Sequence, residues 1–125
     1  MSNVINWFEI PASNFDRACE FYSKVLGGTV QVMDAGDNPL QMGFLPGHKD
    51  QSEVGGAIVT GEGYKPSKDG AVVYLNGGED LTDPLSRIEE AGGKILFPKT
   101  AIGENGFIAQ FIDTEGNRVA LHSIN

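Results

Sequence analysis

The sequence predicts an α+β fold in which two paired β-α-β-β-β modules form a curled mixed sheet with a central cleft. Two predicted helices end in glycine pairs, Gly27-Gly28 and Gly92-Gly93, which lie 65 residues apart (92 − 27). One strand pattern precedes each helix and three follow it, and most of the 17 glycines fall where strands end. One such module leaves a sheet face that it cannot bury alone, so two are expected to pair. The alternative is a single α+β sandwich with accidental internal similarity.

The first module is expected within residues 1–62. Its first strand, Ile5–Ile10, has a two-residue period, which places Trp7 and Glu9 on one face. Ser13 or Asn14 can cap the helix that follows, whose apolar residues recur at helical spacing. Three more strands are expected over Thr29–Met33, Leu40–Leu45 and Glu53–Thr60. Between them we expect a turn over 34–39 and a polar loop over 46–52, in which His48 is a solvated side chain.

The second module is expected within residues 68–125, after a linker in the Gly61–Gly70 segment. Asp80 or Asp83 can cap its helix, and Pro84 is tolerated only near the helix start. The apolar face of that helix is expected to consist of Leu81, Leu85, Ile88 and Ala91. Its strands are expected over Ala71–Asn76, Lys94–Phe97, Phe107–Ile112 and Asn117–Ser123.

The 65-residue offset also makes individual positions equivalent. It pairs Trp7 with Val72 and Glu9 with Tyr74. If a short deletion is allowed later in the module, Ala57 becomes equivalent to Ala120.

Composition and charge exclude several classes of function. The chain has 17 acidic residues against 9 basic ones, a net charge of −8, and no cluster of lysines or arginines, so binding to nucleic acid or an anionic membrane is not expected. The lone Cys19 excludes an internal disulfide and any site built from several cysteines. No signal-peptide pattern precedes the first strand and no apolar run is long enough to span a bilayer, so we expect a cytoplasmic protein.

Four segments together resemble the vicinal oxygen chelate superfamily, the glyoxalase, bleomycin-resistance and extradiol-dioxygenase group. They are the FEIP strand (8–11), the DRACEFYSKVLGG helix (16–28), the DTEGN turn (113–117) and the VALHS strand (119–123). The likeness covers essentially the whole chain and is greatest to small bacterial "predicted lactoylglutathione lyase-related" proteins. It implies a cleft between the sheets of the two modules, and frequently a homodimer.

The resemblance also implies where a metal would be bound. In the metal-dependent members, His, Glu or Gln ligands come from the first and last strands of each module. The corresponding positions here are Trp7, Ala57, Val72 (or its neighbours Ala71 or Val73) and Ala120. None of these side chains can bind a metal, so the resemblance implies a member with no metal and no other cofactor. A divalent metal held by Glu9 and His122 with a third ligand such as Gln110 is the less favoured alternative.

Five residues are candidates for a site in the cleft. Glu9 is the candidate general base, or it is a carboxylate that forms hydrogen bonds within the fold. Trp7 either stacks on a planar substrate or fills the space of the missing metal. Tyr74 and Asn76 share a face and can form hydrogen bonds with a ligand, although Tyr74 can equally belong to the core. His122 can donate or accept in the cleft, or lie near solvent or at the dimer interface.

Two functions fit these residues. The first is a glyoxalase-like protein that binds a small organic molecule between its modules, with lyase or isomerase chemistry inferred by analogy with the fold. The alternative is a non-catalytic binding or sequestering protein of the antibiotic-resistance type, for which the acidic charge would suit a cationic ligand.

Overall fold

The computed structural model describes residues 3–33, 39–47 and 53–125. It confirms the predicted α+β fold class with two similar halves, but the strands form two separate, uncurled sheets instead of the one curled sheet that was predicted. His48 and most of the two connections predicted around it, over 34–39 and 46–52, lie outside the described residues. The first half of the chain forms β1 (Trp7–Pro11), α1 (Phe15–Leu26), β2 (Gln31–Val32), β3 (Gln41–Phe44) and β4 (Gly55–Thr60). The second half forms β5 (Val73–Asn76), α2 (Thr82–Ser86), β6 (Lys94–Ala101), the 3₁₀ helix η1 (Gly103–Asn105), β7 (Phe107–Ile112) and β8 (Arg118–Ser123).

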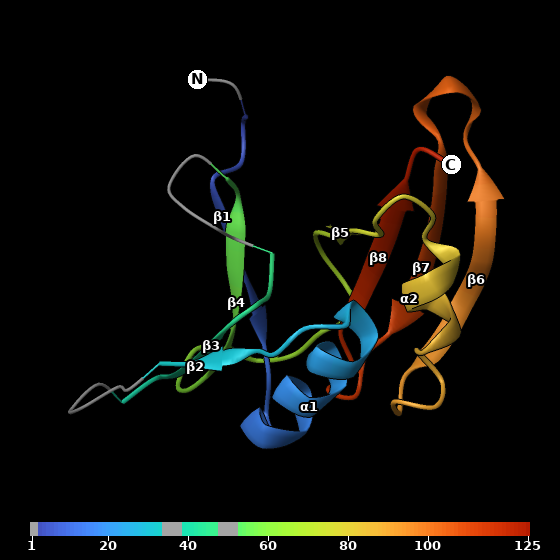
Figure 1. Cartoon of the computed structure of the whole chain (residues 1–125). Helices are drawn as coiled ribbons and strands as arrows, with labels where there is room; N and C mark the ends of the chain where they lie inside the picture. The colour runs from blue at the N-terminus through green and yellow to red at the C-terminus, as the bar shows by residue number, and fades with distance from the viewer. Residues whose placement is uncertain (1–2, 34–38, 48–52) are drawn as a thin grey trace.

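The strands form two four-stranded mixed sheets with the same topology (Figure 1). Their strand orders are β1-β4-β3-β2 and β5-β8-β7-β6. In each sheet the first strand of the half pairs in parallel with the last, and the remaining pairs are antiparallel. Glu9 lies opposite Ala57 in the first sheet, and Tyr74 lies opposite Ala120 in the second. These registers match the predicted equivalence of Glu9 with Tyr74 and of Ala57 with Ala120.

Helix α1 forms as the capping residues predict. The side chain of Asn14 accepts a 3.1 Å hydrogen bond from the backbone N–H of Arg17, so Asn14 rather than Ser13 is the N-cap. Gly27 ends the helix with φ of +72°, a conformation that glycine adopts at little cost. The buried face of the helix consists of Phe15, Ala18, Phe21, Tyr22 and Val25.

Two elements of the second half differ from the prediction. The helix α2 ends at Ser86, and the backbone continues in turns through Ala91 instead of in a long helix. Strand β6 extends to Ala101, four residues beyond the predicted end at Phe97. It is an edge strand, and its register shifts between Phe97 and Thr100, which accommodates the missing N–H of Pro98.

Helix α1 packs against both halves of the chain and joins them into one core. The Phe21 ring lies 6.0 Å from the ring of Phe111 on β7, measured between centroids. Arg87, just after α2, donates to the carbonyl oxygen of Val25 through Nε and Nη2. The buried core contains residues of both sheets and of α1, so neither sheet is packed independently of the other half.

The turn between β7 and β8 binds the beginning of α1. Oε1 of Glu115 accepts the backbone N–H groups of Ser13 and Asn14, at 3.0 and 2.7 Å, and Oε2 accepts from Nε of Arg17 at 2.7 Å. The side chain of Glu115 is fully buried. Burial alone would raise the pKa of Glu115, but the hydrogen bonds from Arg17, Asn14 and Thr114 outweigh burial and lower the pKa below its ordinary value of 4.5.

Two more residues of the same turn connect the halves. The Tyr22 hydroxyl donates to Oδ2 of Asp113 at 2.7 Å, and Nδ2 of Asn117 donates to the carbonyl oxygen of Pro11 at 2.7 Å. The DTEGN segment, which the sequence predicts only as a tight turn, is therefore a cross-link between the modules.

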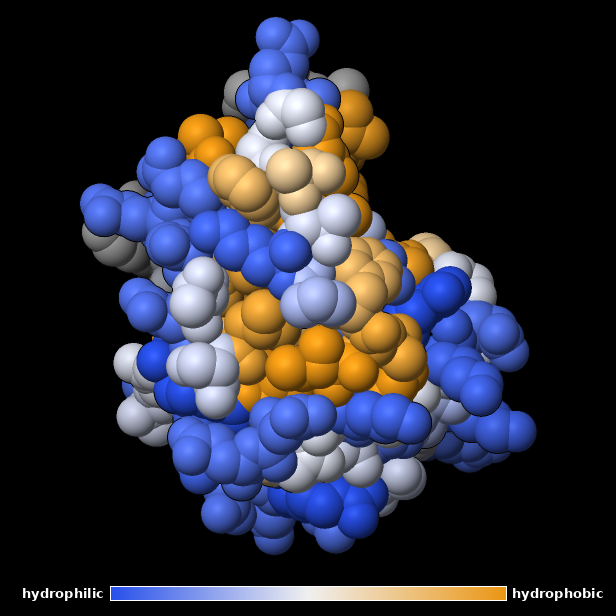
Figure 2. All heavy atoms as spheres, turned by 90° about the vertical axis from the view of Figure 1, so that its right-hand side faces the viewer, coloured by the Kyte–Doolittle hydropathy of each residue, from blue (hydrophilic) through white to orange (hydrophobic). Residues whose placement is uncertain are grey.

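Apolar side chains are also exposed on the second half. Figure 2 shows apolar residues gathered in the middle of the face that the second half presents, with hydrophilic residues around them. The exposed large apolar side chains of this half are Tyr74, Leu96, Ile102 and Ile124. Among the described residues, no helix has the length and apolar character needed to cross a membrane.

Candidate functional site

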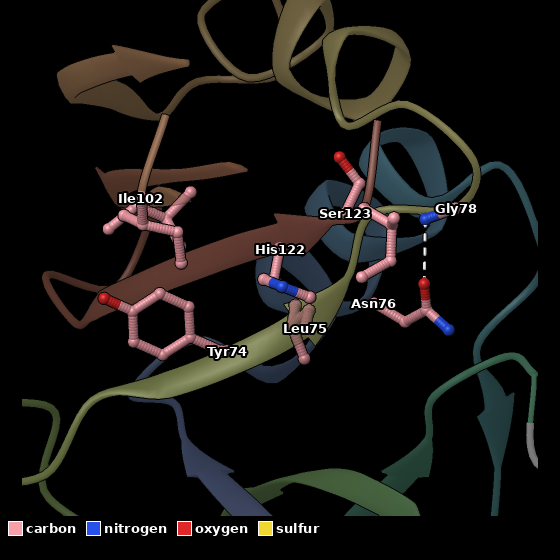
Figure 3. Close-up of a pocket in the computed structure, with 9 residues that line it drawn as sticks. Tyr74, Leu75, Asn76, Gly78, Ile102, His122 and Ser123 are labelled. Atoms are coloured by element: carbon pink, nitrogen blue, oxygen red, sulfur yellow. Dashed lines mark hydrogen bonds between the residues drawn. The ribbon is translucent and has the colours of Figure 1, made fainter. Parts of the chain in front are cut away.

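The second sheet carries a cavity of about 670 Å³, here called the second-sheet cavity (Figure 3). Three of the predicted site residues line it: Tyr74 and Asn76 from β5, and His122 from β8. In the parallel pairing of these strands Asn76 lies opposite His122, and alternate residues of a strand point to the same face, which places the three side chains together. The apolar part of the lining includes Ile102, Ile108 and Ile124.

The 3₁₀ helix η1 fixes the orientation of the imidazole. Nε2 of His122 lies 2.7 Å from the carbonyl oxygen of Asn105. A carbonyl oxygen only accepts, so Nε2 carries the hydrogen of this bond, and Nδ1 is the acceptor of the neutral ring. The sequence gives no sign of this contact, because the three residues of η1 are too few to show a periodic pattern.

The other two polar groups are also oriented by neighbours. Nε2 of Gln110 donates to the Tyr74 hydroxyl at 3.1 Å, so the phenol keeps its own O–H as a donor. Oδ1 of Asn76 accepts the backbone N–H of Gly78 at 2.8 Å, which leaves the amide nitrogen of Asn76 as its donor. The cavity therefore has two donors and one acceptor on a mostly apolar wall, and the hydroxyl of Ser123, which also lines it, is bonded to Leu81 and Asn125.

A second cavity of about 710 Å³, the inter-module cavity, lies between the halves. The first half contributes residues that include Phe8, Leu26 and Val54, and the second half contributes Tyr74 and Asn76. These last two residues therefore line both cavities. A ligand bound at either cavity would contact the same pair of side chains.

Glu9 lines a third and smaller cavity, of about 240 Å³. The Tyr64 hydroxyl donates to Oε1 of Glu9 at 2.9 Å, and this hydrogen bond is the main reason that the pKa of Tyr64 is raised. The contact of Tyr64 with Glu9 was not predicted, because Tyr64 lies in the segment that was predicted to be a linker. The only local indication was one aromatic residue among glycine, lysine and proline.

Trp7 lines none of these three cavities. Its ring packs edge-to-face on Phe44, with centroids 6.0 Å apart, and the residue is 38% exposed. The structure therefore brings together Tyr74, Asn76 and His122 and places Glu9 and Trp7 elsewhere on the two halves.

The fold agrees with the comparison to known proteins. The Glyoxalase/Bleomycin resistance protein/Dioxygenase superfamily matches residues 4–121. The chain belongs to this superfamily. The glyoxalase-like chain is 33% identical over 124 residues to a glyoxylase-like domain-containing protein of Didymella fabae, an alignment that covers 94% of this chain and 91% of the relative.

Solved structures of glyoxalases share the fold of the glyoxalase-like chain. Glyoxalase I from Zea mays is 22% identical, with a TM-score of 0.69 over 94% of this chain and 45% of the maize protein. Glyoxalase I from Leishmania major is 20% identical, with a TM-score of 0.69 over 98% and 87% of the two chains. A family enzyme from Burkholderia phytofirmans is 13% identical, with a TM-score of 0.69 over 96% and 98%. The chain spans a little under half of the maize protein.

The residues at the expected metal positions of the glyoxalase-like chain do not fit a metal ion. Ala57 on β4 pairs with Glu9, Ala120 on β8 pairs with Tyr74, and the methyl group of an alanine has no lone pair to donate. Trp7 offers an indole N–H, which only donates, and Val72 an alkyl group. Across residues 3–33, 39–47 and 53–125, no group of three or more His, Cys, Asp or Glu side chains is placed to hold a metal.

Proposed function

We propose that this glyoxalase-like chain binds a small organic molecule in the second-sheet and inter-module cavities, without a metal ion. The observation that carries the proposal is the convergence of Tyr74, Asn76 and His122 on one apolar-walled cavity. Sites for small molecules are typically cavities of this size, with a mostly apolar lining and a few oriented polar groups. Members of the superfamily also commonly bind small molecules.

The polar groups define what the ligand must offer. The Tyr74 hydroxyl and the Asn76 amide donate, and Nδ1 is the ring nitrogen of His122 that the contact with Asn105 leaves unused. A fitting ligand has at least one acceptor group and one donor group on an apolar body that contacts Ile102 and Ile108. With a net charge of −8, the chain attracts cationic molecules over long range, so an organic cation is the preferred class.

Non-catalytic binding is the function that the geometry supports best. The candidate base, Glu9, does not line the cavity that contains Tyr74 and His122, so a ligand there has no carboxylate of Glu9 beside it. This separation favours a binding or sequestering protein, in which no proton need be transferred. We also propose that the protein is cytoplasmic.

The second candidate function is lyase or isomerase chemistry with Glu9 as general base. The contact with Tyr64 favours it, because a phenol that donates to Oε1 orients the carboxylate and leaves Oε2 to accept a proton. In this reading the substrate occupies the small cavity beside Glu9. Glu9→Gln would abolish turnover of such a substrate, whereas ligand binding at the second-sheet cavity would be unaffected.

We also propose that the protein is a homodimer in which a second copy covers the exposed apolar side chains. Tyr74, Ile102 and Ile124 line the second-sheet cavity and are 44%, 41% and 65% exposed. A second copy over this face would bury them and enclose a ligand. Light scattering coupled to gel filtration should give twice the mass of one chain, and Ile102→Lys should shift the protein towards the monomer. A monomer at all concentrations would rule the dimer out.

A thermal-shift screen with a library of small organic cations and matched neutral analogues tests the binding proposal. A ligand that binds only the folded state raises the melting temperature by mass action. For any hit, His122→Ala and Tyr74→Phe should each weaken binding about tenfold, which corresponds to about 1.4 kcal/mol. Tyr64→Phe, outside both larger cavities, is the matched control and should bind normally. Hits whose affinity is unchanged in both cavity variants would refute the proposed site.

A further inference from the structure

The cavity beside Glu9, here called the polar cavity, is lined by charges of both signs. It lies where β1, the start of β8 and the segment before β5 meet. Glu9 and Asp69 contribute carboxylates, and Lys65 and Arg118 contribute cations. Apolar parts of the wall come from Pro11, Val73 and Val119.

Arg118 brings a buried donor to this wall. Within the described part of the chain, the buried Nε of Arg118 has no hydrogen-bond partner. That atom is closed to solvent, so an acceptor from outside the chain would reach the guanidinium through its other N–H groups, on Nη1 and Nη2. The planar guanidinium matches the geometry of a carboxylate, which it can bind through two parallel hydrogen bonds.

Glu9 supplies the opposite charge. It is half-buried on β1, and its Oε1 accepts from the Tyr64 hydroxyl, so Oε2 is the oxygen that can receive a further donor. In the described residues, ion pairs join Arg17 to Glu115 and Lys99 to Asp80, and none joins Glu9 to Arg118. The two charges of the cavity wall are therefore not neutralised by each other.

We propose that the polar cavity binds a small zwitterion with an ammonium and a carboxylate group close together, such as an α-amino acid. The carboxylate lies on Arg118, with Lys65 as the second cation, and the ammonium group lies on Glu9. A volume of about 240 Å³ falls below the range of drug-sized sites, which limits the ligand to a few heavy atoms beyond the charged groups. This site contains no residue of the second-sheet cavity, so it does not depend on binding there.

Binding of small probes that differ in one charge tests this class of ligand. Glycine and L-alanine carry both charges, glycolate and L-lactate carry only the carboxylate, and ethylamine carries only the ammonium. Titration of the intact protein, followed by amide chemical shifts, should give saturable binding of the amino acids near β1 and β8. The single-charge probes should bind at least tenfold more weakly. Equal binding of amino acid and hydroxy acid would overturn the proposal, and so would the absence of saturable binding of any probe up to about 50 mM.

Variants locate the site. Glu9→Gln and Arg118→Gln should each weaken glycine binding about tenfold or more, and Arg118→Lys should fall between, because it keeps the charge but loses the planar fork. Glu90→Gln and Lys94→Gln change exposed charges outside the cavity and serve as matched controls. If Arg118→Gln does not fold, Arg118→Lys and Glu9→Gln still decide the question. Normal glycine binding in both of these variants would overturn the assignment.

Discussion

The phenol of Tyr22 on α1 donates a 2.7 Å hydrogen bond to Oδ2 of Asp113, and so joins the first helix to the last hairpin of the chain. The Tyr22 side chain is fully buried, and burial together with the nearby Asp113 carboxylate raises the pKa of the phenol well above 10. Asp113 also accepts the backbone N–H groups of Glu115 and Asn117 through Oδ1. This buried carboxylate therefore depends on neighbours from both modules for its hydrogen bonds.

Tyr22→Phe should destabilise the fold by about 1–2 kcal/mol, because it removes a hydrogen bond to a buried charged group. The measurement is the free energy of unfolding from urea denaturation at neutral pH. Tyr64→Phe is the matched control: it also removes a tyrosine–carboxylate hydrogen bond, but one near the surface. The control should lose well under half as much stability, and a Tyr22→Phe protein as stable as the wild type would contradict the role given to Asp113.

Glu115 should make stability depend on acid pH. Its pKa is lower in the folded protein than the ordinary value of 4.5, so its contribution is complete above that value and is lost as the pH falls through the folded pKa. Glu115→Gln should cost about 1–3 kcal/mol at pH 7 through its hydrogen bonds to Ser13, Asn14 and Arg17. As the pH is lowered from about 7 to about 3, which spans the range in which carboxylates titrate, the urea midpoint should fall more steeply for the wild type than for Glu115→Gln. Parallel curves would show that Glu115 does not carry this dependence.

Gly106, which follows η1, should not tolerate alanine. It has φ of +102°, and a β-carbon there would press against the backbone carbonyl of Ser123. Gly103 has φ of +86° but open space around it, so Gly103→Ala should cost only about 1–2 kcal/mol. Gly106→Ala should cost more than that and should also weaken ligand binding at the second-sheet cavity, because the Asn105 carbonyl that orients His122 is adjacent. Equal melting temperatures for the two variants would contradict the steric argument.

Cys19 should react slowly with thiol reagents. Burial raises the pKa of its thiol to about 11, and only the thiolate is nucleophilic. Relative to a free cysteine with a pKa of about 8.5, labelling by Ellman's reagent at pH 7.5 should therefore be roughly 100-fold slower or more. In about 8 M urea, where the protein is unfolded, Cys19 should react with the same reagent at the rate of a free thiol. Rapid labelling of the folded protein would show that the thiol is accessible and ionised.

Divalent metals should not bind stoichiometrically. Trp7, Val72 and the two alanines at the family's metal positions offer no lone pairs to a cation. Dialysis against Ni²⁺, Zn²⁺ or Mn²⁺ followed by elemental analysis should leave far less than one ion per chain, and chelation should not change the melting temperature. One tightly held ion per chain would contradict this, and loss of that ion in Glu9→Gln and His122→Ala would assign it to those residues.

Sequence patterns predicted most of the strands and the internal repeat that relates the two halves. Strand β7 has the predicted bounds, Phe107–Ile112, and the pairing of Glu9 with Ala57 and of Tyr74 with Ala120 matches the predicted repeat. Helix α2 was predicted too long, because its apolar spacing continues after Ser86 although the backbone turns there. Apolar spacing records which side chains are buried, and a series of turns can bury the same side chains.

The site was harder to predict because it depends on distant partners. Tyr64 lies 55 positions from Glu9, and Glu115 lies 102 positions from Ser13, so no local pattern connects either pair. Tyr74, Asn76 and His122 line one cavity, whereas Glu9 lines another. Strand periodicity gives the face of a side chain but not the cavity that it lines. The sequence therefore could not show that Glu9 and His122 line different cavities.

The cross-link between α1 and the β7–β8 turn has a consequence for the synthesis of the chain. Tyr22 and Arg17 precede their carboxylate partners by 91 and 98 residues. At about 5–20 residues per second, a ribosome completes the first helix many seconds before the hairpin that covers it emerges. During that time the apolar face of α1 is exposed to other nascent chains and to chaperones. The order in which the two halves are made therefore leaves this face of α1 uncovered until the later half arrives.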